Sequence, residues 1–143
     1  MEARGLIDTG ALLALLDADD QWHLPCREAF AQLRLPLAST AAVLAELFHL
    51  LGQNPRALSA AWSLLRSGAI TLLPITDADA PDLDRLMARY SDRPMDFADA
   101  TLVRLAEREG LVDILTIDHD DFETYRIGGR KRFRVMPGRR SDF

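Results

Sequence analysis

The sequence predicts an α/β fold in which helices cover a central, mostly parallel sheet. Short apolar runs that suit buried strands alternate along the chain with longer segments whose apolar residues recur at helical spacing. Of the 143 residues, 48% are hydrophobic, which is enough for one substantial core. The chain shows no internal repeat, low-complexity tract or linker. We therefore expect residues 1–143 to form one domain.

The predicted strands are short, and most of them precede a helix. The first ends at Leu6-Ile7, after which Thr9-Gly10 turns the chain into a helix. Residues 112–117 have the best strand pattern, and residues 69–75 have the composition of a strand buried on both faces. The expected strands lie near residues 6–7, 36–38, 69–75 and 112–117, with an edge strand at 133–136.

Capping and stop residues mark the predicted helices. Pro25 suits the first turn of the second helix, Ser39 or Thr40 is expected to cap the third, and Gly52 to end it. The segment from Asp118 to Asp121 is expected to be a polar turn. The helices are expected near residues 10–16, 22–33, 40–52, 56–67, 76–90 and 96–109.

The charge balance argues against a protein that binds nucleic acid through its overall positive charge alone. There are 22 acidic and 17 basic residues, for a formal net charge of -5. Basic residues nevertheless dominate the end of the chain, where only Asp142 opposes Arg126, Arg130, Lys131, Arg132, Arg134, Arg139 and Arg140.

Cysteine content and hydropathy favour a soluble cytoplasmic protein. The single cysteine, Cys26, excludes an internal disulfide. No leader-like segment follows Met1, and no apolar run reaches the about 18 residues that a membrane span needs.

Four carboxylates stand out by their positions. Asp8 and Asp118 each follow a predicted strand, so they are expected at the same edge of a parallel sheet, where α/β folds bind ligands. Glu46 lies alone on an apolar helical stretch, V-L-A-E-L-F-H-L-L, and points along its apolar face. Asp96 and Asp99 share one face at the start of a helix.

Each of these acids also has a purely structural interpretation. Asp8 could cap a loop, Glu46 could lie at the solvent edge of its helical face, and Asp96 with Asp99 could simply stabilise a helix start. Asp120 and Asp121 could be solvated turn residues, with Asp121 able to join the site from outside the ligand set. His23, His49 and His119 show no metal-ligand spacing.

Taken together, the acids predict metal-assisted hydrolysis. Carboxylates gathered with almost no Lys or Arg beside them in sequence would repel each other unless cations intervened, and Mg²⁺ or Mn²⁺ prefers such ligands. Two such ions can activate a water and stabilise the leaving oxygen in phosphodiester cleavage. The basic end is either a solvated edge or a surface for the phosphate backbone, with Arg130, Lys131 and Arg132 as candidate contacts.

Four segments resemble the PIN-domain nucleases, especially the VapC-like toxins of bacterial toxin-antitoxin pairs. They are L-I-D-T-G-A-L-L-A-L-L-D at the start, A-E-L at Glu46, M-D-F-A-D-A-T-L-V from Met95, and I-L-T-I-D-H-D-D-F from Ile114. They occur in the right order over nearly the whole chain, so together they are fairly specific.

The resemblance implies a three-layer α/β/α PIN-like fold and a Mg²⁺- or Mn²⁺-dependent endoribonuclease. It also implies a homodimer and a cognate antitoxin whose C-terminal segment occupies the active-site groove. In this sequence the acidic quartet of the family is matched by Asp8, Glu46, Asp99 and Asp118. Thr9 and Thr116 match the small hydroxyl positions beside the quartet, and Asp96 matches an additional acid of one subgroup.

Other functions remain open at this point. A PIN nuclease of RNA maturation outside a toxin pair, or a catalytically idle PIN-like scaffold, would carry similar motifs. A receiver-like acidic pocket is disfavoured, because Asp8 stands alone after the first strand and Lys131 lies in a basic cluster instead of at a strand end. A small gene directly upstream that encodes a DNA-binding antitoxin would favour a toxin over a maturation nuclease or an idle scaffold.

Overall fold

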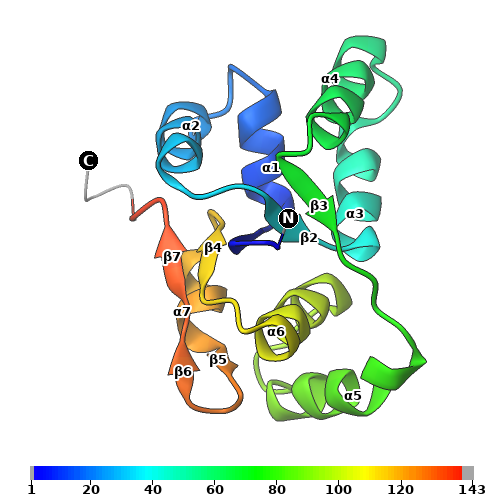
Figure 1. The fold of residues 1–143 in the computed structure, drawn as a ribbon, viewed down its shortest axis with the longest axis vertical. Helices are drawn as coiled ribbons and strands as arrows, with labels where there is room; N and C mark the ends of the chain where they lie inside the picture. Colours follow the sequence, from blue (N-terminus) through cyan, green and yellow to red (C-terminus); the bar gives the residue numbers. More distant parts are fainter. Residues whose placement is uncertain (1, 140–143) are drawn as a thin grey trace.

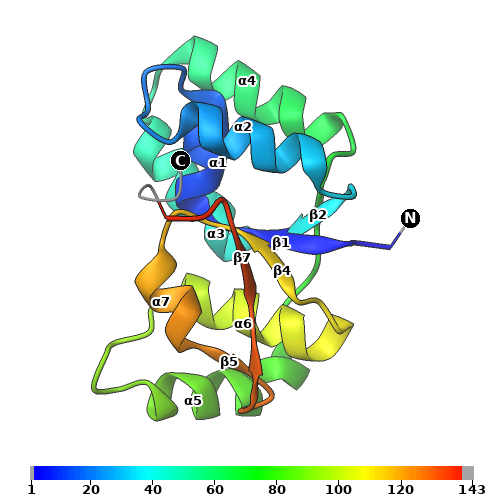
Figure 2. The ribbon, with the colours of Figure 1, turned by 90° about the vertical axis from the view of Figure 1, so that its left-hand side faces the viewer.

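A computed structural model describes residues 2–139 of the chain as a five-stranded parallel sheet with helices on both faces (Figures 1 and 2). The strand order is β3-β2-β1-β4-β7. The strands are β1 (Gly5–Ile7), β2 (Leu37–Ser39), β3 (Ile70–Leu72), β4 (Asp113–Leu115) and β7 (Arg134–Met136). Arg140 and Asp142, which belong to the basic end of the sequence, lie outside the described residues.

Figure 2 shows helices α1, α2 and α4 above the sheet and α5, α6 and α7 below it. The helices are α1 (Thr9–Leu16), α2 (His23–Gln32), α3 (Ala41–Leu51), α4 (Pro55–Arg66), α5 (Ala80–Arg89), α6 (Phe97–Glu109) and α7 (His119–Thr124). A single 3₁₀ turn, Asp77–Asp79, precedes α5, and α3 contacts both α1 and α6. The arrangement confirms the three-layer α/β/α prediction.

The core lies where the central strands meet α1 and α6. Leu6, Ile7, Ile114 and Leu115 are fully buried in the two central strands. Helix α6 buries most of its length and contributes the fully buried residues Ala100, Leu102, Val103, Leu105 and Ala106. Its two ends are therefore fixed relative to the sheet, which matters for the acids at its start. No helix among residues 2–139 is long and apolar enough to cross a membrane.

Side-chain caps fix several helix starts. Thr40 accepts a hydrogen bond from the Val43 amide at the start of α3, and Asn54 caps α4. Asp96 caps α6 through the Asp99 amide, and α6 ends at Gly110, whose φ of 70° is in the left-handed region.

Two sequence-based expectations were wrong. Residues 69–75 do not form a strand buried on both faces, because β3 pairs only with β2 and lies at an edge with Leu72 exposed. The expected turn at Asp118 to Asp121 is instead the start of α7, which fully buried Phe122 anchors in the core. Acids in the first turn of a helix are favourable, so the acidic run suits this start as well as a turn.

The structure also contains a short antiparallel hairpin, β5 (Arg126–Ile127) with β6 (Lys131–Arg132), which the sequence did not predict. Two-residue strands that carry charged side chains have no apolar alternation for a pattern to detect. Gly128 and Gly129, with φ of 61° and 78°, form its turn.

Candidate metal centre

The predicted acids gather at the carboxyl ends of β1 and β4. These strands are direct neighbours, since Leu6 pairs with Ile114 and Ile7 with Leu115, so the segments that follow them emerge side by side. Gly10 permits a close approach there: a Cβ at this position would lie 2.8 Å from Cγ1 of Ile117. The sheet and this glycine bring Asp8 and Asp118 to one rim.

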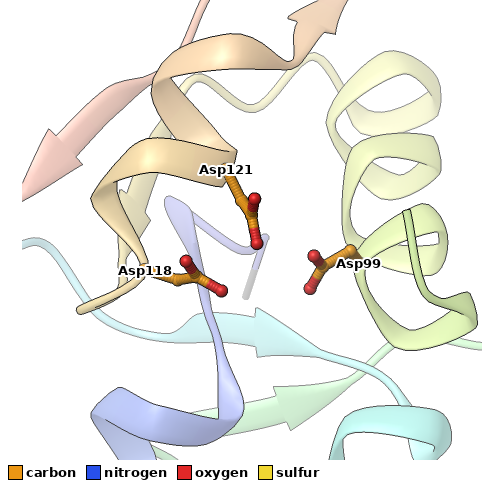
Figure 3. A group of neighbouring side chains, drawn as sticks. All are labelled: Asp99, Asp118 and Asp121. Atoms are coloured by element: carbon orange, nitrogen blue, oxygen red, sulfur yellow. The ribbon is translucent and has the colours of Figure 1, made fainter. Parts of the chain in front are cut away.

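Three carboxylates converge from different elements. Asp99, Asp118 and Asp121 each offer an oxygen, and these oxygens all lie within 4.8 Å of one another. Figure 3 shows the three side chains pointing toward one another, Asp99 from α6, Asp121 from α7 and Asp118 from the position just before α7. Asp99 is buried, Asp121 is half-buried and Asp118 is exposed, so the group opens to solvent on one side. Asp121, predicted only as an outer candidate, lies within this group.

Asp8 is a buried carboxylate with both oxygens held. The Thr9 amide donates to Oδ1 at 2.7 Å, and the Thr116 hydroxyl donates to Oδ2 at 3.0 Å. Asp8 therefore caps helix α1, whereas its structural interpretation had been the cap of a loop. Each carboxylate oxygen has a second lone pair, so these bonds do not exhaust its capacity as a ligand.

Asp99 is held from both sides. Its amide donates to Asp96 Oδ1 at 2.8 Å, and the Tyr125 hydroxyl donates to Asp99 Oδ2 at 2.8 Å. The cap interpretation of Asp96 is therefore correct, and Asp96 itself is exposed. Asp96 also acts on the site through its charge, which helps to raise the pKa of Asp99.

The carboxyl groups resist ionisation. Burial raises the pKa of Asp8 to about 6. Burial, followed by the charges of Asp8 and Asp96, raises the pKa of Asp99 to about 8. Loss of solvent, followed by the neighbouring carboxyl of Asp121, raises the pKa of Asp118 to about 7. The site would carry several negative charges with too little positive charge beside them if all of its carboxyls ionised. A bound cation would supply that positive charge.

Glu46 borders this group from α3. Its side chain is exposed although Val43 and Leu47 beside it are buried, so it lies at the solvent edge of the helical face. The Thr9 hydroxyl lies 3.2 Å from Glu46 Oε2, and the Glu46 charge contributes to the raised pKa of Asp8. Thr9 thus links Asp8 with Glu46, and Thr116 links Asp8 with Asp118, whose amide donates to the Thr116 hydroxyl at 3.0 Å.

Two arginines reach the acids on α7. Arg93, in the loop before α6, places Nε 3.3 Å from Asp121 Oδ1 and donates to the Thr124 hydroxyl. Arg139 pairs with Asp120 and Glu123 at 2.8 and 2.7 Å. Sequence reasoning missed Arg93 and Tyr125, because neither lies in a strand-end or helix-start pattern.

The structure does not bring Arg130, Lys131 and Arg132 to the acids. They lie in the β5–β6 hairpin, whose Gly128 amide donates to Glu107 Oε2 at 3.1 Å. Glu107 follows Asp99 by eight residues on α6, a rise of about 12 Å along the helix axis. The hairpin turn therefore packs near the opposite end of α6.

The sequence model of the PIN domain family matches residues 5–128. The chain belongs to the PIN domain family. This PIN domain is 33% identical over 135 residues to "Ribonuclease VapC26" of Mycobacterium tuberculosis, a match that covers 92% of this chain and 99% of the relative.

Solved structures agree with the PIN fold. One is the VapC20 toxin of Mycobacterium tuberculosis, which is described as cleaving the sarcin-ricin loop. Its TM-score is 0.74 at 22% identity, over 92% of this chain and 98% of that chain. Another is PAE2754 of Pyrobaculum aerophilum, with a TM-score of 0.52 at 23% identity over 84% of each chain. At these identities the likeness shows the fold.

The acidic group of this PIN domain fits a divalent metal ion. Its donors are carboxylate oxygens, the ligands that hard cations prefer. They come from α6 and from the start of α7. Loss of solvent first, and the neighbouring carboxyl groups second, raise the pKa values of Asp99 and Asp118, and a cation would offset both effects. The open side leaves room for water and substrate.

Proposed function

We propose that this PIN domain is a divalent-metal-dependent endoribonuclease that serves as the toxin of a toxin-antitoxin pair. The observation that carries the proposal is the convergence of Asp99, Asp118 and Asp121, beside Asp8, at the carboxyl ends of the central strands. The ribonuclease name of its mycobacterial relative supports the substrate class.

In this proposal Mg²⁺ or Mn²⁺ is held by Asp8, Asp99 and Asp118, with Asp121 as an additional ligand. Glu46 binds the ion directly or through water, from its exposed position beside Asp8. When bound, the ion supplies Lewis-acid activation of water and neutralises charge that develops on the phosphate.

The remaining residues position these acids. Tyr125 orients the Asp99 carboxylate, and Thr116 with the Thr9 amide fixes both oxygens of Asp8. Asp96 caps α6 and so sets the position of Asp99 at the helix start. Such supporting hydrogen bonds hold metal ligands in one geometry and are costly to remove.

The partners proposed are an RNA substrate, a cognate antitoxin that covers the acidic groove, and a second copy of the chain. The competing proposal is a PIN nuclease of RNA maturation outside a toxin pair. A small gene directly upstream that encodes a DNA-binding protein able to block cleavage supports the toxin. Cleavage confined to one precursor RNA, with no inhibitor encoded nearby, supports maturation.

The test is cleavage of purified RNA by purified protein. We expect cleavage with Mg²⁺ or Mn²⁺, loss of cleavage in EDTA, and recovery when Mn²⁺ is added in excess. Activity that survives thorough chelation would show that the metal assignment is wrong. Absence of cleavage with either ion on every RNA tested would favour a non-catalytic PIN scaffold.

A further inference from the structure

A hollow of about 450 Å³ lies between the starts of α3 and α6 and the segment that follows β3. Its wall includes Thr40, Ala42, Leu73, Ile75, Phe97 and Thr101. None of the residues that line it is charged. It is therefore an apolar pocket.

The pocket and the acids share two helices. Phe97 directly follows the cap residue Asp96 and precedes Asp99 by two positions, and Ala42 lies one turn before Glu46 on α3. The pocket lies beyond the carboxyl ends of β2 and β3, whereas the acids lie beyond those of β1 and β4. Adjacent strands are about 5 Å apart. A phosphate at the acids and the adjoining base of the same RNA strand could therefore occupy the two sites together.

Phe97 is the feature that points to a ligand. Its side chain is 51% exposed and stands at the first position of α6, while the following residues Ala98 and Asp99 are buried. A ring that exposed adds little to the core, yet here it forms part of a pocket wall. Exposed aromatic rings beside a nucleic-acid path are stacking surfaces for bases.

The two polar side chains of the pocket, Thr40 and Thr101, already use their hydroxyl hydrogens inside the protein. Thr101 Oγ1 donates to the Ala98 carbonyl at 2.6 Å, so its hydroxyl accepts from Thr40 Oγ1 at 2.9 Å. Both hydroxyl hydrogens are thereby used inside the protein. The side chains of the pocket thus offer an occupant apolar contact and a ring face, which suits a flat group held by stacking.

We propose that this pocket binds a nucleobase of the RNA strand next to the scissile phosphate, with Phe97 as its stacking platform. The inference rests on the proposed function, because the metal centre places the phosphate and the pocket takes the adjoining base. An apolar side chain of a protein partner is the competing occupant, and the test distinguishes it.

The experiment measures binding separately from cleavage. Two fluorescently labelled strands of about ten nucleotides are used, one of mixed RNA sequence and one of abasic ribose-phosphate. Each is titrated with protein in Ca²⁺, under conditions in which no cleavage is detected. The variants are Phe97→Ala, Phe97→Trp and the matched control Trp62→Ala. Trp62 is 53% exposed on α4, which lies above the sheet, whereas α6 lies below it (Figure 2). Circular dichroism checks the fold of each variant.

We expect Phe97→Ala to weaken binding of the mixed-sequence strand about 5- to 100-fold. Phe97→Trp and Trp62→Ala should leave this binding within about twofold of the unsubstituted protein, a margin well below the effect of one stacked base. The abasic strand should bind the unsubstituted protein and Phe97→Ala equally. If Phe97→Ala does not fold, the test uses the unsubstituted protein and Phe97→Trp. Both should bind the mixed-sequence strand more tightly than the abasic strand.

Three results would overturn the inference. Equal losses on the mixed and abasic strands would mean that Phe97 does not contact a base. Unchanged RNA binding by Phe97→Ala would assign the pocket to something other than RNA, such as a protein partner. Equal binding of both strands by the unsubstituted protein would show that no base is held. Cleavage in Mn²⁺ is scored separately, so base binding without cleavage would reject the proposed function and leave the pocket assignment standing.

Discussion

The Tyr125 hydroxyl donates a 2.8 Å hydrogen bond to Asp99 Oδ2. Tyr125 is fully buried and packs edge-on against Tyr90 and Phe122, with ring centroids 5.0 and 5.2 Å away. Burial, with the Asp99 charge next, raises the pKa of the Tyr125 phenol, so it remains a donor at neutral pH. An aromatic core thus fixes the orientation of a carboxylate at the candidate metal centre.

We predict that Tyr125→Phe lowers metal affinity or RNA cleavage by about 10- to 100-fold, the usual cost of losing a hydrogen bond behind a metal ligand. The ring and its packing are kept, so the protein should still fold. Mn²⁺ titration and initial cleavage rates measure the effect. The matched control is Tyr90→Phe, which removes a hydroxyl that accepts from the Arg126 amide, away from the acids. Equal behaviour of the two variants would contradict a positioning role for Tyr125.

Metal binding should depend steeply on pH. The pKa values of Asp8, Asp118 and Asp99 are raised to about 6, 7 and 8, so near pH 7 the metal-free protein keeps most of a proton on Asp99 and part of one on Asp118, and Asp8 gains its proton at lower pH. A metal ion must displace those protons, so its affinity should rise between pH 6 and 8, by about tenfold per pH unit for each proton released. Calorimetric titration of Mn²⁺ in two buffers of different ionisation enthalpy counts the protons. Binding that releases no protons would contradict the raised pKa values.

Asp99→Asn should make the metal-free protein more stable. The folded-state pKa of Asp99 lies above its ordinary value, so ionising this group opposes folding as pH rises from about 4 to about 8. Asparagine carries no charge and keeps an oxygen for Tyr125. Thermal denaturation in EDTA should show a Tm advantage of Asp99→Asn that is small at pH 4 and largest at pH 8 and above. A Tm advantage that does not change with pH would exclude charge as its cause.

A separate ion-pair network holds α5 against α6. Buried Asp79 accepts from the Thr76 amide, from Arg104 Nε at 2.8 Å and from Arg108 Nη1 at 2.9 Å. The Thr76 amide first, and then Arg104, hold the pKa of Asp79 below its ordinary value. This contribution to stability is therefore present above about pH 4 and lost as pH falls below that value.

We predict that Asp79→Ala lowers the free energy of unfolding by about 3 kcal/mol at pH 7, since it leaves two arginines without their shared partner. Urea denaturation at pH 7 and near pH 3 measures the change, which should shrink at the lower pH. Asp77→Ala, an exposed neighbour in the same 3₁₀ turn, is the control. A similar loss in both variants would assign the effect to the turn instead of the network.

The sequence predicted the part of the candidate site that lies at strand ends and at a helix start. Asp8 and Asp118 follow adjacent parallel strands, and Asp99 begins a helix that the core holds in place, so a pattern of elements was enough to bring them together. Asp121 was underestimated because the acidic run after Asp118 suits a turn as well as the helix that forms. Only that helix turns Asp121 toward Asp99.

Other features depended on tertiary contacts that no local pattern carries. Tyr125 reaches Asp99 because β5, which directly follows it, packs against α6. The Arg130 to Arg132 segment lies far along α6 because its hairpin folds onto Glu107. The strand at residues 70–72 is an edge strand because of the sheet order, which its composition does not reveal. The single-domain organisation, the homodimer and the cytoplasmic location stay predictions.

The most direct measurement compares Asp99→Asn with the unsubstituted protein on total cellular RNA in Mn²⁺, with 5′ ends mapped by sequencing. Asp92→Asn, an exposed acid in the loop before α6, is the matched control. The proposed function predicts discrete new 5′ ends with the unsubstituted protein and Asp92→Asn, and none with folded Asp99→Asn or in EDTA. Undiminished cleavage at the same sites by Asp99→Asn would contradict the assignment of these acids as the centre of a metal-dependent ribonuclease.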